Sequence, residues 1–254
     1  MSTGVTSHSS SLPAGPSGGA APLSKAILAQ IRAELIMTSR RGENLLVTII
    51  FPLGLLIFLH SFFAISVESL LAGVLAVSVI SSGMVSLGIA TGYDRYYGVL
   101  KRLGSSPLPR SGLLAAKIVS VLVVEVVQVA LLAALALLFY GWRPNGSFSI
   151  VVPILLLGTA AFAGLGMLMA GALRAEATLA LANGLFLFLL LFGGVFAPLP
   201  GLAGDISWLL PSAALAGALN GALTLQGVPI QSVVLLVIWA VIFLVAATLT
   251  FKWE

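Results

Sequence analysis

Six long apolar runs constrain the fold of this chain more than any other feature of its sequence. Each run is close to the roughly 20 residues that crossing a bilayer takes. Within lipid, only helices and closed barrels satisfy their backbone polar groups. Barrel strands alternate in polarity over about ten residues, whereas these runs are continuously apolar. We therefore expect an all-α integral membrane protein with six transmembrane helices, at residues 45–65, 70–90, 118–140, 150–173, 179–197 and 233–251.

The composition excludes most classes of soluble protein. Hydrophobic residues make up 59% of the 254 residues and charged residues 8%, against about 45–50% and about 25% in an average soluble domain. The chain has no cysteine and two histidines, which predicts neither a catalytic nor a metal centre. It has no glycine-rich phosphate loop, so we expect no cofactor and no ATPase activity of its own. The net charge of +4 accompanies the apolar runs, which favours the membrane over nucleic acid.

The basic residues predict the orientation in the membrane. If the six runs cross in turn, eleven of the twelve Lys and Arg residues lie on one side, and Arg143 alone lies on the other. Basic residues accumulate on the cytoplasmic side of membrane proteins. We therefore expect a multi-pass protein of the cell membrane with both termini in the cytoplasm.

Two segments precede the first apolar run. Residues 1–22 are mainly Ser, Gly, Ala and Pro, which predicts a disordered cytoplasmic tail. Residues 23–254 are expected to form one transmembrane domain. At its start, apolar residues recur at helical spacing over residues 25–39, which predicts an amphipathic helix on the cytoplasmic membrane surface. Glu34 is an exception to this pattern, because it falls close to the apolar stripe.

The longest charged segment, residues 93–117, lies between the second and third runs. We expect a short helix over residues 94–103. Asp94 is a favoured residue type for capping its start, and Gly104 and Pro107 interrupt the segment directly after its end. A solvated basic loop would explain the charges of this segment. It would leave the three tyrosines and the helix-then-proline layout unexplained.

Glu125 is the only charged residue inside any of the six runs. A charge at that depth costs about 2.5 kcal/mol or more, and such residues usually face a bundle interior or a cavity. Three roles stay open: gating or coupling of movement, contact with a cationic cargo, or a protonated carboxyl bonded to Gln128 or to a serine of the second run. The serines of that run either line a pathway or bond their own backbone.

Residues 198–231, between the last two runs, are mostly apolar but repeatedly interrupted by Gly and Pro. Each uninterrupted piece is too short to cross a bilayer. We expect short helices in the outer leaflet that close the outer side of the bundle, because irregular backbone at that depth must be buried in protein or line a cavity.

Taken in order, these features resemble the membrane subunit of ABC-2-type exporters, a family of drug and glycolipid efflux permeases, over about residues 24–254. The family more often has Glu at the position of Asp94. The matching residues are Asp94, Arg95, Gly98, Leu100, Leu103, Pro107, Leu108 and Lys117 in the charged segment, and Phe192, Gly193, Gly194, Val195, Phe196, Ala197, Pro198, Trp208, Leu209, Leu210 and Pro211 in the late segment.

The resemblance implies that the short helix docks into a separate cytoplasmic ATPase subunit. Two permease chains, identical or different, would work with two ATPases among membrane lipids. A drug or antibiotic is the first expectation for a hydrophobic or amphipathic cargo, and a lipid the second. The implied coupling residues are Tyr93, Asp94, Arg95, Tyr97, Gly98, Leu100, Lys101 and Arg102, and those of an outer gate are Pro198, Trp208 and Pro211.

Three alternatives belong to other classes of protein. An ion-gradient-driven secondary carrier normally shows a second ionisable residue in another span, and Glu125 has only His60 as a candidate. A non-transporting membrane scaffold would tolerate disruption of residues 94–102. A membrane-embedded enzyme needs paired catalytic residues, which the sequence does not offer. If the coupling role holds, charge reversal at Asp94 or Arg95 should uncouple the ATPase and leave folding intact.

Overall fold

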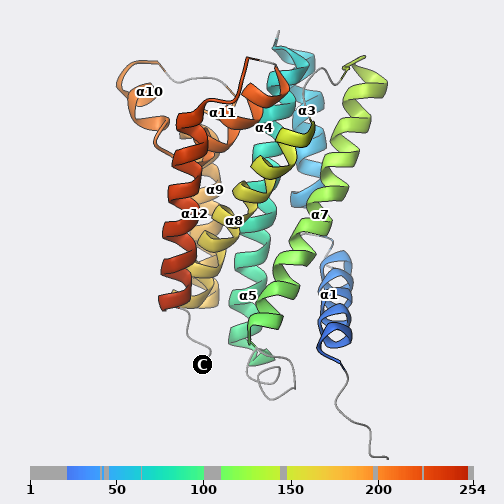
Figure 1. Cartoon of the computed structure of the whole chain (residues 1–254), viewed down its shortest axis with the longest axis vertical. Helices are drawn as coiled ribbons and strands as arrows, with labels where there is room; N and C mark the ends of the chain where they lie inside the picture. The colour runs from blue at the N-terminus through green and yellow to red at the C-terminus, as the bar shows by residue number, and fades with distance from the viewer. Residues whose placement is uncertain are drawn as a thin grey trace, which may run out of the picture.

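The described part of the chain folds as a bundle of helices (Figure 1). A computed structural model describes residues 22–40, 42, 46–63, 65–99, 110–143, 148–196, 200–224 and 226–250, and their regular elements are all helical. The π-helical segments are η1 and η2. In chain order the elements are α1 (Leu23–Arg40), η1 (Leu46–Ile50), α3 (Phe51–Phe62), α4 (Val67–Val79), η2 (Ile80–Ser86), α5 (Leu87–Tyr96), α7 (Arg110–Phe139), α8 (Phe148–Ala172), α9 (Ala175–Phe192), α10 (Gly201–Ser207), α11 (Pro211–Leu223) and α12 (Ile230–Thr250).

Among the described residues, five helical segments are long and apolar enough to cross a bilayer, which agrees with the predicted all-α membrane class. Each of them overlaps one of the six expected spans. The segment predicted at residues 45–65 forms a shorter apolar helix, Thr48–Phe62. The sixth span therefore stays a prediction. The five long segments are Val67–Tyr96, Ala115–Phe139, Ser149–Ala172, Ala175–Phe192 and Ile230–Thr250.

The boundaries of two spans differ from the apolar runs. The second helix continues six residues past residue 90 to Tyr96, because the polar residues of α5 find partners on neighbouring helices. The fifth span was predicted to continue to residue 197, and this was wrong. Helix α9 ends at Phe192, and Gly194 adopts a φ of 60°, which favours glycine.

The continuous helix from α4 through η2 to α5 lies at the centre of the bundle. Its most apolar stretch is 94% buried, against 22% for α12, which leaves much of α12 facing outward. Close approach of α8 to this central helix depends on glycine. A Cβ atom built on Gly166 would lie 2.7 Å from the backbone oxygen of Gly83, and one on Gly88 would lie 3.1 Å from the Cα of Gly166.

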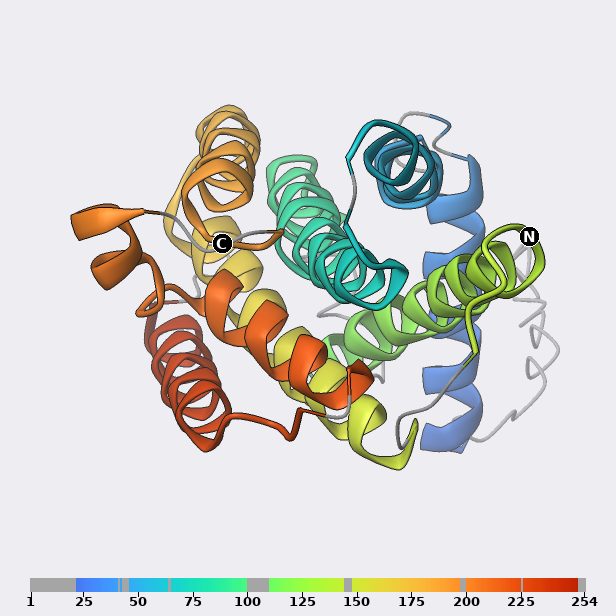
Figure 2. The same ribbon diagram turned by 90° about the horizontal axis from the view of Figure 1, so that it is seen from above.

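The two ends of the bundle are built differently. Helix α1, the ends of α5 and α12 and the start of α7 share one end, and α10 and α11 lie at the other (Figure 1). Viewed along the bundle, α1 appears side-on while α3 and α9 appear nearly end-on, so α1 lies across the bundle axis (Figure 2). Helix α11 also crosses this axis and buries ten of its residues. The predicted tail, residues 1–22, falls almost entirely outside the described residues.

Candidate functional site

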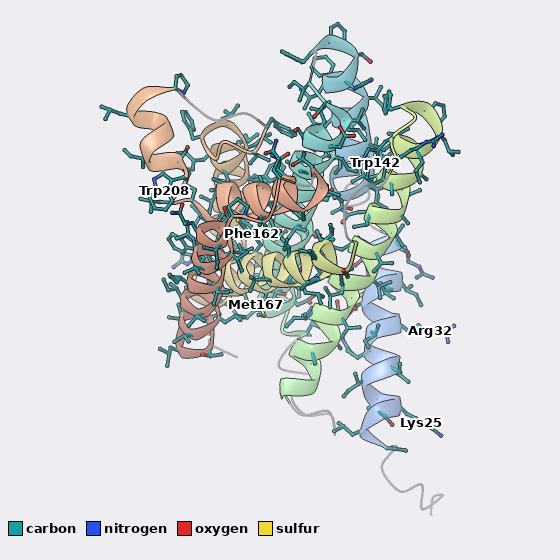
Figure 3. All side chains as sticks on the ribbon, turned by 45° about the horizontal axis from the view of Figure 1, so that its top comes forward. Lys25, Arg32, Trp142, Phe162, Met167 and Trp208 are labelled. Carbon is teal, nitrogen blue, oxygen red and sulfur yellow. The ribbon has the colours of Figure 1, made fainter. Side chains whose placement is uncertain are left out.

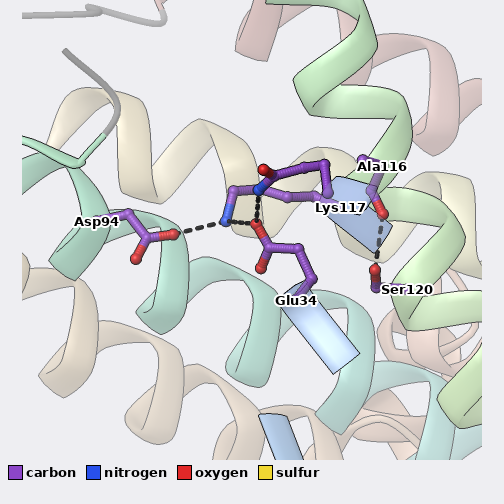
Figure 4. Close-up of polar contacts among 6 residues, drawn as sticks. Glu34, Asp94, Ala116, Lys117 and Ser120 are labelled. Atoms are coloured by element: carbon purple, nitrogen blue, oxygen red, sulfur yellow. Dashed lines mark hydrogen bonds and ion pairs between the residues drawn. The ribbon is translucent and has the colours of Figure 1, made fainter. Parts of the chain in front are cut away.

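Lys117 joins three helices through a buried ion triad. Its ammonium nitrogen lies 2.6 Å from Oδ2 of Asp94 on α5 and 3.0 Å from Oε1 of Glu34 on α1 (Figure 4). All three residues are buried. A buried ammonium group is tolerated only when it is paired. We call Glu34, Asp94 and Lys117 the charged triad; it ties α1 and α5 to α7.

Arg95 is also held within the chain. Its guanidinium donates hydrogen bonds to the backbone oxygens of Gly171 and Leu173, at the end of α8. The last carbonyls of a helix lack partners within that helix and carry partial negative charge, so a cation fits this position. Arg95 and Asp94 thus fasten α5 to two different neighbours.

These contacts change the expected layout of the coupling segment. Asp94 does not cap a new helix, because α5 continues from the membrane-spanning helix and ends at Tyr96. The chain then turns at Gly98, whose φ is 68°. Leu100, Lys101 and Arg102 lie outside the described residues, so the coupling role of the segment stays a prediction.

The accessible side chains at the end of α5 are tyrosines. Tyr96 and Tyr97 are each 63% exposed, and Tyr93 is half-buried. The ring of Tyr97 stacks near that of Tyr93, with 6.0 Å between centroids, and meets the ring of Tyr96 edge-on at 5.1 Å. We call Tyr93, Tyr96 and Tyr97 the tyrosine cluster. Large aromatic rings of this kind are enriched at protein interfaces.

Glu125 lies deeper in the bundle and is surrounded by hydroxyl groups. The hydroxyl of Ser82 on η2 lies 2.9 Å from Oε1 of Glu125, and the hydroxyl of Thr159 on α8 lies 2.5 Å from Oε2. All three side chains are buried. The bond to Ser82, from the second predicted span, is one of the structural partners that the sequence left open for this acid.

The hydrogens available to this cluster allow two arrangements. Each hydroxyl also lies 2.8–2.9 Å from a carbonyl four residues earlier in its own helix, that of Ser78 for Ser82 and that of Leu155 for Thr159. A hydroxyl has one proton to donate. An ionised Glu125 takes both hydroxyl protons, whereas a protonated Glu125 donates its own and leaves the hydroxyls to the carbonyls. The cluster can therefore hold either charge state with little movement of its heavy atoms.

Gln128 binds a different element from Glu125. Its amide nitrogen donates to the backbone oxygen of Thr48 in η1, and its side-chain oxygen has no hydrogen-bond partner among the described residues. Gln128 therefore ties the first apolar helix to α7. It is not one of the hydrogen-bond partners of Glu125 described above, which are the hydroxyls of Ser82 and Thr159.

A small polar cavity connects these contacts. Its volume is about 40 Å³, and Glu34 and Lys117 line it together with Ser82, Ser120 and Thr48. Since one water needs about 10–15 Å³ of such space, the cavity has room for two or three. It extends from the charged triad to the hydroxyl that faces Glu125.

The residues predicted as an outer gate are separated in the structure. Trp208 is 53% exposed at the end of α10, on the edge of the molecule, whereas Pro211 is buried as the first residue of α11 (Figure 3). The backbone oxygen of Leu209 between them accepts a hydrogen bond from the indole of Trp239 on α12 at 2.8 Å. Pro198 lies outside the described residues.

Several residues of the site were not among those predicted from the sequence to act in coupling, inside the membrane or at an outer gate. Glu34 gave a signal, because an acid beside an apolar stripe needs a buried cation. Lys117 was named only among the residues that carry the family resemblance, and its position gave no signal for this pairing. Tyr96 belongs to the same tyrosine-rich stretch as Tyr97. Thr159 gave none, because only the packing of α8 brings it to Glu125.

Comparison with known proteins adds one finding. A family model described as ABC-2 type transporter matches residues 25–224. A comparison with curated proteins found no match. The matched region contains the charged triad, the tyrosine cluster and Glu125, and it ends just after α11.

Proposed function

Because the chain belongs to the ABC-2 type transporter family, we propose that this membrane permease is the subunit of an ATP-driven exporter that receives its energy from a separate ATPase. The tyrosine cluster carries the proposal. It exposes two large aromatic rings at the end of the central helix, and the charged triad joins the same helix end to α1 and α7. A partner that binds these rings gains a rigid connection to the interior of the bundle.

We propose the following route for movement. An ATPase that binds or releases nucleotide shifts the end of α5, and Asp94 carries this shift to Lys117 on α7. Glu125 lies eight residues further along the same helix, about 12 Å at 1.5 Å per residue. The shift then changes the spacing of α7 from η2 and α8, where Ser82 and Thr159 bind the carboxyl. ATP thereby biases two states of one pathway.

The cargo we propose is hydrophobic or amphipathic, with a drug or antibiotic first and a lipid second. Charged residues make up 8% of the chain, which suits such a molecule better than a large polar one. Two permease chains form the working unit, and α10 and α11 close its outer end. Helix α11 supports this role, because it lies buried across the end of the bundle (Figure 2).

A single-cysteine experiment tests the ATPase contact. The chain has no cysteine, so Tyr97→Cys introduces one unique attachment point. We expect a thiol-directed crosslinker in native membranes to capture a protein that carries a nucleotide-binding P-loop. Arg143→Cys is the matched control, since Arg143 is exposed and follows the end of α7 that lies opposite to α1 and the end of α5 (Figure 1).

Equal capture of the ATPase from both variants would contradict the contact. Its absence from both Tyr96→Cys and Tyr97→Cys would do the same, provided that both cysteines are labelled by a small maleimide. Labelling shows that the thiols are accessible, so a negative result then concerns the partner.

One observation favours a second candidate, an ion-gradient-driven carrier. Glu34 and Lys117 of the charged triad line the same cavity as Ser82, whose hydroxyl binds Glu125. These are ionisable groups beyond His60, the candidate that the sequence offered. The two candidates differ in their energy source. Efflux of a hydrophobic fluorescent dye from cells should stop on ATP depletion at constant proton gradient if the exporter proposal is correct. It should stop with a protonophore at constant ATP if the carrier is correct.

A further inference from the structure

An apolar groove lies between α1 and α7, next to the small polar cavity, with which it shares Thr38 and Val124. Its volume is about 560 Å³, within the range of about 300–1,000 Å³ that is typical of small-molecule sites. Leu28 and Ile36 of α1 and Val123 and Val127 of α7 line it, and all four are at least 37% exposed. Such a groove beside a membrane-spanning helix is open to the hydrocarbon of the bilayer.

The exposed charges of α1, which forms one wall of this groove, are all positive. Helix α1 carries Lys25, Arg32 and Arg40, and all three are exposed. Its single acid, Glu34, is buried and paired with Lys117. The negative charge that would otherwise offset Arg32 is therefore already used inside the bundle.

The positions of these cations favour one side of α1. Lys25 and Arg32 are seven residues apart, which places them on the same face of a helix. Figure 3 shows both side chains on the side of α1 that points away from α7. Arg32 also lines the groove, so its aliphatic stem covers apolar surface while its guanidinium reaches polar surroundings.

We propose that this groove binds an anionic phospholipid from the leaflet on the side of α1. One acyl chain lies between α1 and α7, and the phosphate binds Arg32, with Lys25 and Arg40 adding long-range attraction. The occupant must have both an apolar chain and a negative headgroup, because the groove is apolar and Arg32 is the one charged residue among those that line it. A bound lipid would fill the space between α1 and α7 and so limit the movement of α1, which carries Glu34, relative to Lys117.

Competition between two lipids tests the headgroup. The purified full chain in detergent is mixed with equal amounts of phosphatidylglycerol and phosphatidylcholine, and bound lipid is counted by native mass spectrometry. We expect phosphatidylglycerol to be retained severalfold better. Arg32→Gln should lower this preference about fivefold, the usual contribution of one basic residue near an anionic surface. Arg143→Gln removes the same charge at the other end and should change nothing.

A second pair of variants tests the groove itself. Val127→Trp fills the space between α1 and α7 and should reduce retention of both lipids at least threefold. Val126→Trp is its matched control, because Val126 is 68% exposed on the same helix but does not line the groove. A melting temperature near that of the unmodified chain establishes that each variant is folded.

Two outcomes would overturn the site. One is equal retention of the two lipids by the unmodified chain, and the other is an equal effect of the two members of either pair. The measurement uses the isolated chain without an ATPase. Failure of ATP-driven transport would therefore leave its result unchanged.

Discussion

Two polar clusters lie along α7, and they stabilise buried acids in different ways. Near the end of the bundle, Lys117 forms direct ion pairs with both Glu34 and Asp94. About two turns further into the bundle, Glu125 has two hydroxyl groups as partners. The first cluster depends on one cation that two acids share. The second tolerates two charge states, because its partners are neutral and can rotate.

This difference separates structural support from adaptability. Removing one member of a buried ion pair leaves an unpaired charge, which typically costs about 3–5 kcal/mol. Hydroxyl partners that can turn to their own helix backbone lose much less. We therefore expect the charged triad to fix the positions of α1, α5 and α7. The surroundings of Glu125 are the part that can respond during transport.

The largest expected effect comes from Lys117→Met. This change leaves Glu34 and Asp94 buried without a cation, and we expect a loss of about 3–5 kcal/mol in the free energy of unfolding. Denaturant unfolding in mild detergent, followed by tryptophan fluorescence, measures the loss.

The control for Lys117→Met removes all three charges together. In the variant Glu34→Gln, Asp94→Asn, Lys117→Met, most of the lost stability should return, because neutral side chains cost little to bury compared with unpaired charges. A single Lys117→Met variant as stable as the unmodified chain would contradict the triad.

Asp94→Asn should have a smaller effect. Lys117 keeps Glu34 as a partner, so we expect a loss of about 1.5–3 kcal/mol, the usual contribution of a charged hydrogen bond. For charge reversal at Asp94 we expect a larger loss of stability, whereas the sequence alone predicted intact folding, because a cation placed there would face Lys117. Thermal melting of the charge-reversal variant in detergent distinguishes loss of stability from intact folding. An unchanged melting temperature would show that folding is intact.

Gly166→Ala tests whether α8 must lie close to η2 for Thr159 on α8 and Ser82 on η2 both to bind Glu125. The added Cβ would lie 2.7 Å from the backbone oxygen of Gly83, so the helices must separate, at a cost of about 1–3 kcal/mol. Gly184→Ala in α9 is the matched control, since nothing lies within 4 Å of its added Cβ. Equal melting temperatures for the two variants would refute close packing at this site.

Glu125→Gln should have the smallest effect on stability. An amide keeps one acceptor and gains donors for Ser82 and Thr159, so we expect a change within about 1 kcal/mol. Efflux measured beside stability then decides the role of the acid. Normal stability with complete loss of efflux indicates an active carboxyl, whereas a loss of stability as large as that of Lys117→Met would remove the contrast between the clusters.

The sequence predicted the helical class and most of the spans because lipid imposes strong rules on backbone hydrogen bonds. It failed at the helix ends for a physical reason. Hydropathy stops at the first polar residues, yet Asp94 and Arg95 continue α5 because other helices satisfy them. At α9 the apolar run continued while Gly194 ended the helix.

The candidate site was predictable only in part. Glu125 was identified because a lone charge inside an apolar run is costly. Its partner Ser82 was one of several serines in the second run, and nothing in the sequence distinguishes it from Ser78. The charged triad joins residues from three distant segments. A single sequence does not show which distant residues pair with one another, so Asp94 was interpreted as a contact with a partner.

The central claim is that a separate ATPase powers this permease, and gentle purification from the native membrane tests it most directly. We predict that a soluble protein with a nucleotide-binding P-loop co-purifies in a fixed ratio, identified by mass spectrometry. A preparation that contains no such ATPase, even after crosslinking in the membrane, would contradict the claim and favour the ion-driven carrier.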